Sequence, residues 1–101
     1  MSKRYKTDVR KEEIVAVALK LAEASHYAQV QRKQIADIMG VTPPALTYHY
    51  GTMEQLRRDI MRAAIKQENL VVVAQGLVAQ DVYAKKAPEA LRRRAIELAT
   101  A

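Results

Sequence analysis

Apolar residues recur at helical spacing through most of the chain. In the first segment they fall at i, i+3, i+4, i+7 and i+8, which is the spacing of one face of an α-helix. The residues at these positions are Ile14, Val17, Ala18, Leu21 and Ala22. We expect a helix over about residues 8–25, with Thr7 or Asp8 as its N-cap.

Residues 32–39 carry a second, shorter helical pattern, and the residues after it predict where the next helices begin. Gly40 is placed to end this helix in a left-handed conformation. Thr42 before Pro43 combines an N-cap with a proline at the first helical position, which predicts a third helix from residue 43. Thr52 matches the first position of a capping box and predicts a fourth helix from about residue 53.

The rest of the chain predicts further helices and no sheet. We expect the fourth helix to be long and to run to about Leu70, with Gly76 as a later interruption. Residues 77–86 and 88–99 predict two more short helices, the last one started by Pro88. With only three Gly and three Pro, the chain lacks the turns that a many-stranded sheet needs. The sequence therefore predicts an all-α fold.

The composition of the chain indicates which partners and which cellular compartment to expect. A chain of 101 residues has room for one domain of ordinary size. Its 17 Lys and Arg residues against 11 Asp and Glu give a net charge of +6, which favours polyanionic partners. The chain has no Cys, no apolar run near the ~20 residues that span a bilayer, and no apolar signal-peptide segment after its basic N-terminus. We therefore expect a cytoplasmic protein that binds no membrane.

No set of residues for catalysis or metal binding stands out. Thiol catalysis and Cys-ligated zinc are excluded because there is no Cys. His26 and His49 are the only histidines, and neither has carboxylates at ligand spacing or belongs to a Ser-His-Asp arrangement. We expect no enzymatic activity, no metal and no cofactor.

The first three helices together predict a helix-turn-helix unit. Two short helices joined by a turn that contains Gly40, and packed on a first amphipathic helix, form such a unit. The second short helix of the unit fits the DNA major groove. A small helical bundle without a DNA role has the same pattern, so more specific residues are needed to choose between the two.

Three motifs between residues 11 and 56 are more specific. They are Lys11-x-x-Ile14-Val15-x-Val17-Ala18-x-x-Leu21, then Ile35-Ala36 followed by Met39-Gly40-Val41-Thr42, and then Ala45-Leu46-x-x-His49-Tyr50-x-Thr52-x-Glu54-x-Leu56. Together they resemble the N-terminal DNA-binding domain of the TetR family of transcriptional regulators. The resemblance implies a three-helix helix-turn-helix head over residues 1–56, in which the helix at 43–50 reads DNA.

The chain departs from that family at several positions and in length. Family members usually carry Tyr at the place of Thr47 and Lys at the place of Met53, and both commonly contact DNA phosphates, so these contacts are lost or replaced here. Pro43 and Pro44 make the start of the recognition helix apolar, which suits contact with thymine methyls but cannot read guanine. The family's ligand-binding domain is longer than residues 57–101, so we expect no small-molecule inducer.

We expect the DNA contacts to come from the start of the second helix and from the exposed face of the third. Arg32 and Lys33 are placed for phosphates, with a solvated charge pair as the alternative. Thr47 and Tyr48 are placed for bases or the sugar-phosphate backbone, with solvent exposure as the alternative. The resemblance implies a phosphate contact for His49, with helix packing as the alternative. The full predicted set is Arg32, Lys33, Thr42, Pro43, Pro44, Ala45, Thr47, Tyr48 and His49.

Residues 57–101 remain for assembly. The segment from Ile60 to Val82 is more apolar than so short a chain buries on itself, so we expect it to hold two copies together. The leading interpretation is a homodimeric, sequence-specific regulator that binds double-stranded DNA. The alternative is a protein-interaction module, such as an anti-repressor or adaptor, that uses the same helical surface without specific DNA binding. The residues at Thr47 and Met53 favour this alternative.

Overall fold

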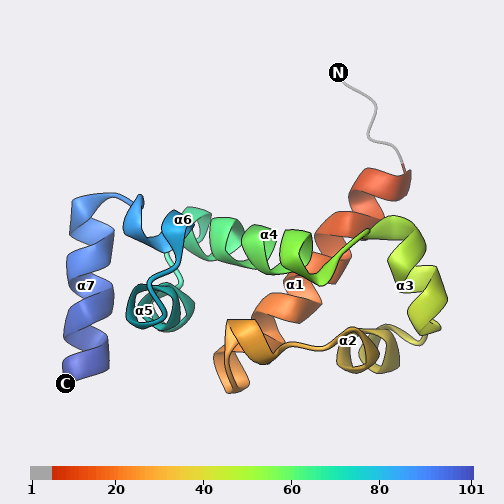
Figure 1. The fold of residues 1–101 in the computed structure, drawn as a ribbon, viewed down its shortest axis with the longest axis horizontal. Helices are drawn as coiled ribbons and strands as arrows, with labels where there is room; N and C mark the ends of the chain where they lie inside the picture. Colours follow the sequence, from red (N-terminus) through yellow and green to blue (C-terminus); the bar gives the residue numbers. More distant parts are fainter. Residues whose placement is uncertain (1–5) are drawn as a thin grey trace.

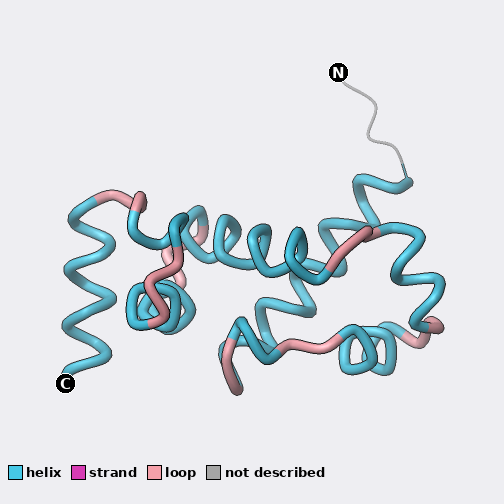
Figure 2. Tube along the Cα trace, in the orientation of Figure 1, coloured by secondary structure: helices cyan, strands magenta, loops and turns pink. Residues whose placement is uncertain are grey.

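The computed structural model describes residues 6–101, and every regular element in that range is a helix (Figure 1, Figure 2). The elements are α1 (Lys6–Ala24), the 3-10 helix η1 (Tyr27–Gln29), α2 (Arg32–Met39), α3 (Pro43–His49), α4 (Met53–Lys66), α5 (Leu70–Val78), α6 (Val82–Lys85) and α7 (Glu89–Thr100). The predicted all-α class is confirmed for this part of the chain. None of these helices has both the length and the apolar content needed to cross a bilayer.

The other helices are arranged around α4. This helix packs against α1, α5 and α6, with α2 and α3 at one end of the molecule and α5, α6 and α7 at the other (Figure 1). The helix α1 also contacts α2 and α3. The expected boundary between a head at 1–56 and a second part at 57–101 falls inside α4, so this helix is common to both parts.

One apolar core runs through both ends of the molecule. Its fully buried side chains include Ile35 of α2 and Leu46 of α3 as well as Ile60 of α4 and Val72 of α5. Burial of apolar area is the main stabilising contribution to folding. Because the core is continuous, we expect the two ends to unfold together.

The turn between α2 and α3 forms as predicted. Gly40 has φ = 69°, in the left-handed region, and it ends α2 there. The Oγ1 of Thr42 accepts a hydrogen bond from the Ala45 N–H over 3.3 Å, and Pro43 occupies the first helical position of α3. The start of α3 is therefore set by short-range backbone chemistry.

The helix α4 begins where the sequence predicts and ends earlier. The side chain of Thr52 caps its first turn. The helix ends at Lys66 instead of about Leu70, so the predicted end of the fourth helix is wrong. Glu68 has φ = 54°, which interrupts the helical backbone, and the side chain of Asn69 then caps α5.

Three other boundaries also differ from the prediction. The helix α1 already includes Thr7 and Asp8, so neither is its N-cap. Gly76 lies inside α5 instead of interrupting the chain. A side chain is not tolerated at this position, because an added Cβ would lie 2.4 Å from Met61 Cε and 2.8 Å from the Ala84 Cβ. The predicted helix at 77–86 is divided into the end of α5, a turn and the short α6.

A polar network ties the C-terminal end of α1 to α5 and α6. The Oε1 of Gln75 accepts a hydrogen bond from the Tyr27 N–H over 2.9 Å, and its Nε2 donates to the Ala22 carbonyl over 2.9 Å. The Tyr27 hydroxyl donates to Asp81 Oδ2 over 3.1 Å. Burial, together with the charge of Asp81, raises the pKa of Tyr27 to about 12. Directional bonds as well as apolar packing thus connect α1 and η1 to α5 and to the start of α6.

Candidate nucleic-acid interface

The short helix α3 is held to the body from one side. Leu46 in its middle is 2% exposed, and Tyr50, directly after its last residue, is 7% exposed. The Tyr50 hydroxyl donates a hydrogen bond to Asp59 Oδ2 of α4. Burial and this hydrogen bond raise the pKa of Tyr50 above its ordinary value, so the phenol remains a donor. The body of the protein therefore fixes both the middle of α3 and its C-terminal end.

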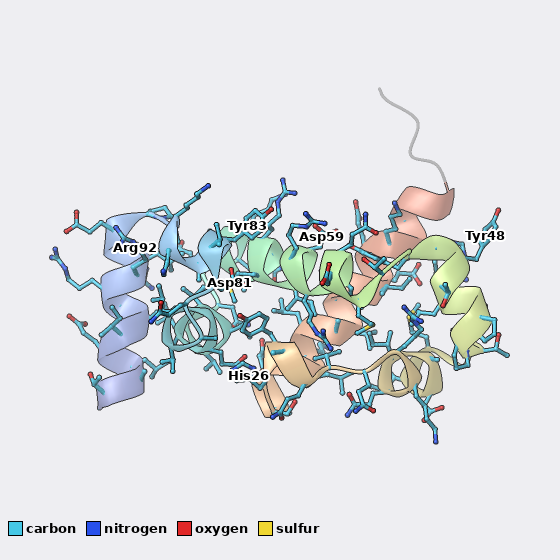
Figure 3. All side chains as sticks on the ribbon, viewed as in Figure 1. His26, Tyr48, Asp59, Asp81, Tyr83 and Arg92 are labelled. Carbon is cyan, nitrogen blue, oxygen red and sulfur yellow. The ribbon has the colours of Figure 1, made fainter. Side chains whose placement is uncertain are left out.

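The opposite face of α3 points away from the body. Tyr48 is 81% exposed, and its side chain lies at the end of the molecule that carries α3 (Figure 3). Pro43, Pro44, Ala45 and Thr47 are exposed as well. An aromatic side chain this exposed contributes little to the core.

The two threonines of the predicted set already take part in helix hydrogen bonds. Thr42 Oγ1 accepts from the Ala45 N–H, so its hydroxyl hydrogen remains available for a phosphate oxygen. Thr47 donates its hydroxyl hydrogen to the Pro43 carbonyl over 3.1 Å. In this rotamer the Thr47 oxygen can only accept, which suits the amino groups of adenine and cytosine better than a phosphate.

His49 is half-buried and faces Tyr48 edge-on, with the ring centroids 5.2 Å apart. Its Nδ1 is buried and has no hydrogen-bond partner within residues 6–101. Part of the ring is therefore packed against the protein. A DNA contact by His49 would have to use Nε2.

Arg32 and Lys33 form the first turn of α2, which packs against α3. Arg32 is half-buried and Lys33 is exposed, and neither makes an ion pair with a described residue. Cations at the N-terminal end of a helix oppose the helix dipole, so this placement costs some stability. A phosphate bound at this turn would offset that cost, because it would interact favourably with the cations and the dipole.

The structure brings the nine predicted residues onto two neighbouring helices. Seven of them lie on α3 or its N-cap, and Arg32 and Lys33 begin α2. No protein-family model, curated protein or solved structure matches the chain. In the described range, no three side chains of His, Asp or Glu are grouped so that they could hold a metal ion. The functional interpretation therefore rests on the residues and their geometry.

Ile38 is an exposed residue of this surface that the sequence analysis missed. It is 60% exposed on α2, close to the turn that leads into α3. The helical pattern of Ile35, Ala36 and Met39 already places Ile38 off the buried face, and this was the available signal. Ile38 makes this end of the molecule partly apolar as well as basic.

Proposed function

We propose that this protein is a transcriptional regulator that binds double-stranded DNA sequence-specifically as a homodimer, with α3 as its recognition helix. The observation that carries the proposal is Tyr48, which is 81% exposed on a short helix fixed to the body through its other face. A helix presented in this way has dimensions that the major groove admits. The resemblance of residues 11–56 to the TetR-family head supports the same assignment.

The exposed residues suggest a division of roles on DNA. Arg32 and Lys33 would contact phosphates and set the position of the protein on the duplex. Tyr48 would contact a base or sugar, and Pro43 and Pro44 would lie against thymine methyl groups. The net charge of +6 would favour association with the polyanion before specific contacts form.

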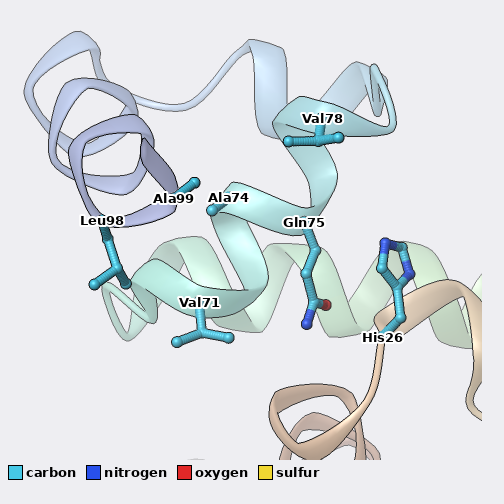
Figure 4. A pocket seen from close by; sticks show the side chains of 7 residues that line it. All are labelled: His26, Val71, Ala74, Gln75, Val78, Leu98 and Ala99. Atoms are coloured by element: carbon cyan, nitrogen blue, oxygen red, sulfur yellow. The ribbon is translucent and has the colours of Figure 1, made fainter. Parts of the chain in front are cut away.

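The surface that supports a dimer lies on α5 and α7. A groove of about 340 Å³ there is lined mainly by Val71, Ala74, Val78 and Leu98 (Figure 4). The Val78 side chain, which lines this groove, is 79% exposed. Contiguous exposed apolar side chains of this kind are typical of protein-protein contacts. A second copy of the chain would remove them from water.

The shape of the molecule is compatible with two heads on one DNA face. Its principal dimensions are 39 × 34 × 18 Å, and α3 lies toward the opposite end of the long axis from α7 (Figure 1). Two copies related by a twofold axis parallel to the long axis would direct both α3 helices the same way. The separation of the two α3 helices would be set by the distance of α3 from that axis, and binding to adjacent half-sites on one DNA face requires about 34 Å, one turn of B-DNA.

A protein-interaction module is the second candidate, and one observation favours it. The exposed residues at the end of α2 and the start of α3 include Ile38, Pro43, Pro44 and Ala45, which offer no hydrogen-bonding side chain to DNA. In this function the same surface would bind an apolar patch of another protein. Arg32 and Lys33 would then contribute little to affinity.

A mobility-shift titration with random duplex DNA at rising salt separates the two candidates. If each head of a dimer uses Arg32 and Lys33, the four phosphate contacts predict a log–log salt slope of about −3 to −4. Failure to retain DNA at low salt would reject the DNA-binding proposal and favour the protein-interaction module.

A further inference from the structure

A second basic surface lies outside the residues proposed to contact DNA bases. A cleft of about 240 Å³ opens where α1, α4 and α6 meet beside Tyr50. Three cationic side chains line it: Lys11 of α1, and Arg58 and Arg62 of α4. Asp59 and Tyr83 also line it and lie on the same side of the molecule (Figure 3).

The carboxylate in the cleft does not neutralise the three cations. Asp59 Oδ2 accepts the hydrogen bond of the Tyr50 hydroxyl, and Oδ1 lies 3.9 Å from Arg62 Nη1. Arg58 makes no ion pair with a described residue, and Lys11 lies over the Tyr50 ring with its Nζ 5.8 Å from the centroid. The cleft therefore holds more positive than negative charge.

These cations come from two helices and line one cleft. Arg58 is half-buried and Lys11 is exposed, and like charges on separate helices would repel one another least if they pointed apart. A hydrogen bond with the neighbouring Tyr83 side chain raises the pKa of Arg58 above its ordinary value. The cleft also reaches Gly51 at the N-terminal end of the 14-residue helix α4, where the helix dipole adds partial positive charge.

The volume and the charged side chains of the cleft indicate which class of ligand it can bind. Pockets for drug-sized molecules usually measure ~300–1,000 Å³, so this cleft suits a smaller group. Guanidinium groups bind phosphate oxygens through two parallel hydrogen bonds, and an ammonium group adds a point charge. We propose that Lys11, Arg58 and Arg62 form a binding site for a phosphate group.

The phosphate group could belong to a free phosphorylated molecule or to a DNA backbone that passes α4. The chemistry of recognition is the same in both cases. We expect no inducer in a separate ligand-binding domain, because residues 57–101 are too few to form one. The open cleft is a different kind of site, because its residues come from α1, α4 and α6. The site therefore does not depend on α3 reading DNA.

The first experiment contains no DNA and uses inorganic phosphate as the probe. Melting curves and titration calorimetry compare sodium phosphate with sodium chloride at equal ionic strength and pH 7. The wild-type protein should melt at higher temperature in phosphate and should release or absorb heat on binding. Arg58→Gln and Lys11→Gln should each weaken phosphate binding about tenfold, the loss expected for one charge-assisted hydrogen bond.

The matched control is Arg93→Gln, which removes one positive charge from α7. Arg93 is exposed, pairs with Glu89 over 3.0 Å and does not line the cleft. This variant should bind phosphate like the wild type. Circular dichroism in chloride alone checks that each variant is folded. If wild type, Arg58→Gln and Arg93→Gln respond equally to phosphate, the effect is generic and the proposal is overturned.

A second experiment distinguishes the two sources of phosphate once the site is shown. If Arg58→Gln also weakens binding to duplex DNA, and phosphate competes with DNA only in the wild type, the backbone occupies the cleft. If Arg58→Gln binds DNA like the wild type, the site takes a free phosphorylated ligand. Either result supports the phosphate site, and a failure of DNA binding alone would count only against the proposed function.

Discussion

The two ends of the molecule expose different kinds of side chain. At the α3 end, the exposed set includes Tyr48 and Lys33, which carry groups that can contact bases or phosphates. At the α5–α7 end, Val71, Val78 and Leu98 are exposed around a groove and carry no polar atoms. The proposed division into a DNA-binding end and a dimer-forming end rests on this difference in the groups that the two ends present.

The substitution with the largest expected effect removes the side chain that packs α3 against the body of the protein. Leu46→Ala deletes a side chain that is 2% exposed, and it should lower the free energy of unfolding by about 2–5 kcal/mol. Urea unfolding followed by circular dichroism measures this change. Tyr48→Ala on the same helix is the control and should stay within about 0.5 kcal/mol of the wild type. Equal losses in the two variants would mean that α3 is not docked through Leu46.

A charge in the apolar groove should separate the two proposed copies. Val78→Asp should convert a dimer to a monomer and weaken binding to a two-site DNA by about 10²–10⁴-fold, because the second head would no longer be tethered. Light scattering at tens of micromolar gives the mass. Val82→Asp is the matched control, since Val82 is 59% exposed and does not line this groove. A wild-type protein that is monomeric without DNA would contradict the dimer and leave the groove unexplained.

Loss of the exposed aromatic ring should affect DNA binding without affecting the fold. Tyr48→Ala should weaken binding to a cognate site by about 1–3 kcal/mol. A binding isotherm and a melting curve on the same sample check both parts of the prediction. Unchanged affinity would remove Tyr48 from the reading surface, and a large fall in melting temperature would place it in the core.

The smallest expected effect concerns the polar network that joins α1 and η1 to the α5–α7 end. The pKa of Tyr27 is raised from its ordinary value of 10.0 to about 12 in the folded protein. Its protonated hydroxyl therefore stabilises the fold below pH 10, and this contribution is lost as the pH rises through 12. Tyr27→Phe should cost about 0.5–1.5 kcal/mol at pH 8, and less at pH 12. Urea midpoints at the two pH values, with Tyr48→Phe as control, measure the difference. A cost that is the same at both pH values would exclude the hydrogen bond to Asp81 as its cause.

Short-range signals explain which parts of the fold were predictable. Gly40 places the end of α2, and Thr42 and Thr52 place the starts of α3 and α4, because capping depends on residues a few positions apart. The end of α4 was not predictable in the same way. Nothing in the local sequence indicates that Glu68 adopts a positive φ. The local sequence also does not show why a Gly lies at position 76, because the close approach of α5 to Ala84 that requires it is a tertiary contact.

Local sequence patterns likewise predict one of the candidate sites but not the other two. The exposed face of α3 follows from helical periodicity, since Tyr48 lies off the face that carries Leu46. The proposed phosphate site does not follow from periodicity, because Lys11, Arg58 and Tyr83 come from three helices that only the fold brings together. The same holds for the apolar groove, where Val71 and Leu98 lie on different helices.

Selection of bound fragments from random duplex DNA, followed by sequencing, tests the central claim most directly. If α3 reads DNA in a twofold-symmetric dimer, the enriched fragments should share a palindromic consensus whose half-sites lie about 10 base pairs apart, or a multiple of that spacing. Tyr48→Ala should reduce the enrichment while remaining folded. Fragments without any consensus, retained equally by wild type and Tyr48→Ala, would contradict sequence-specific reading by α3.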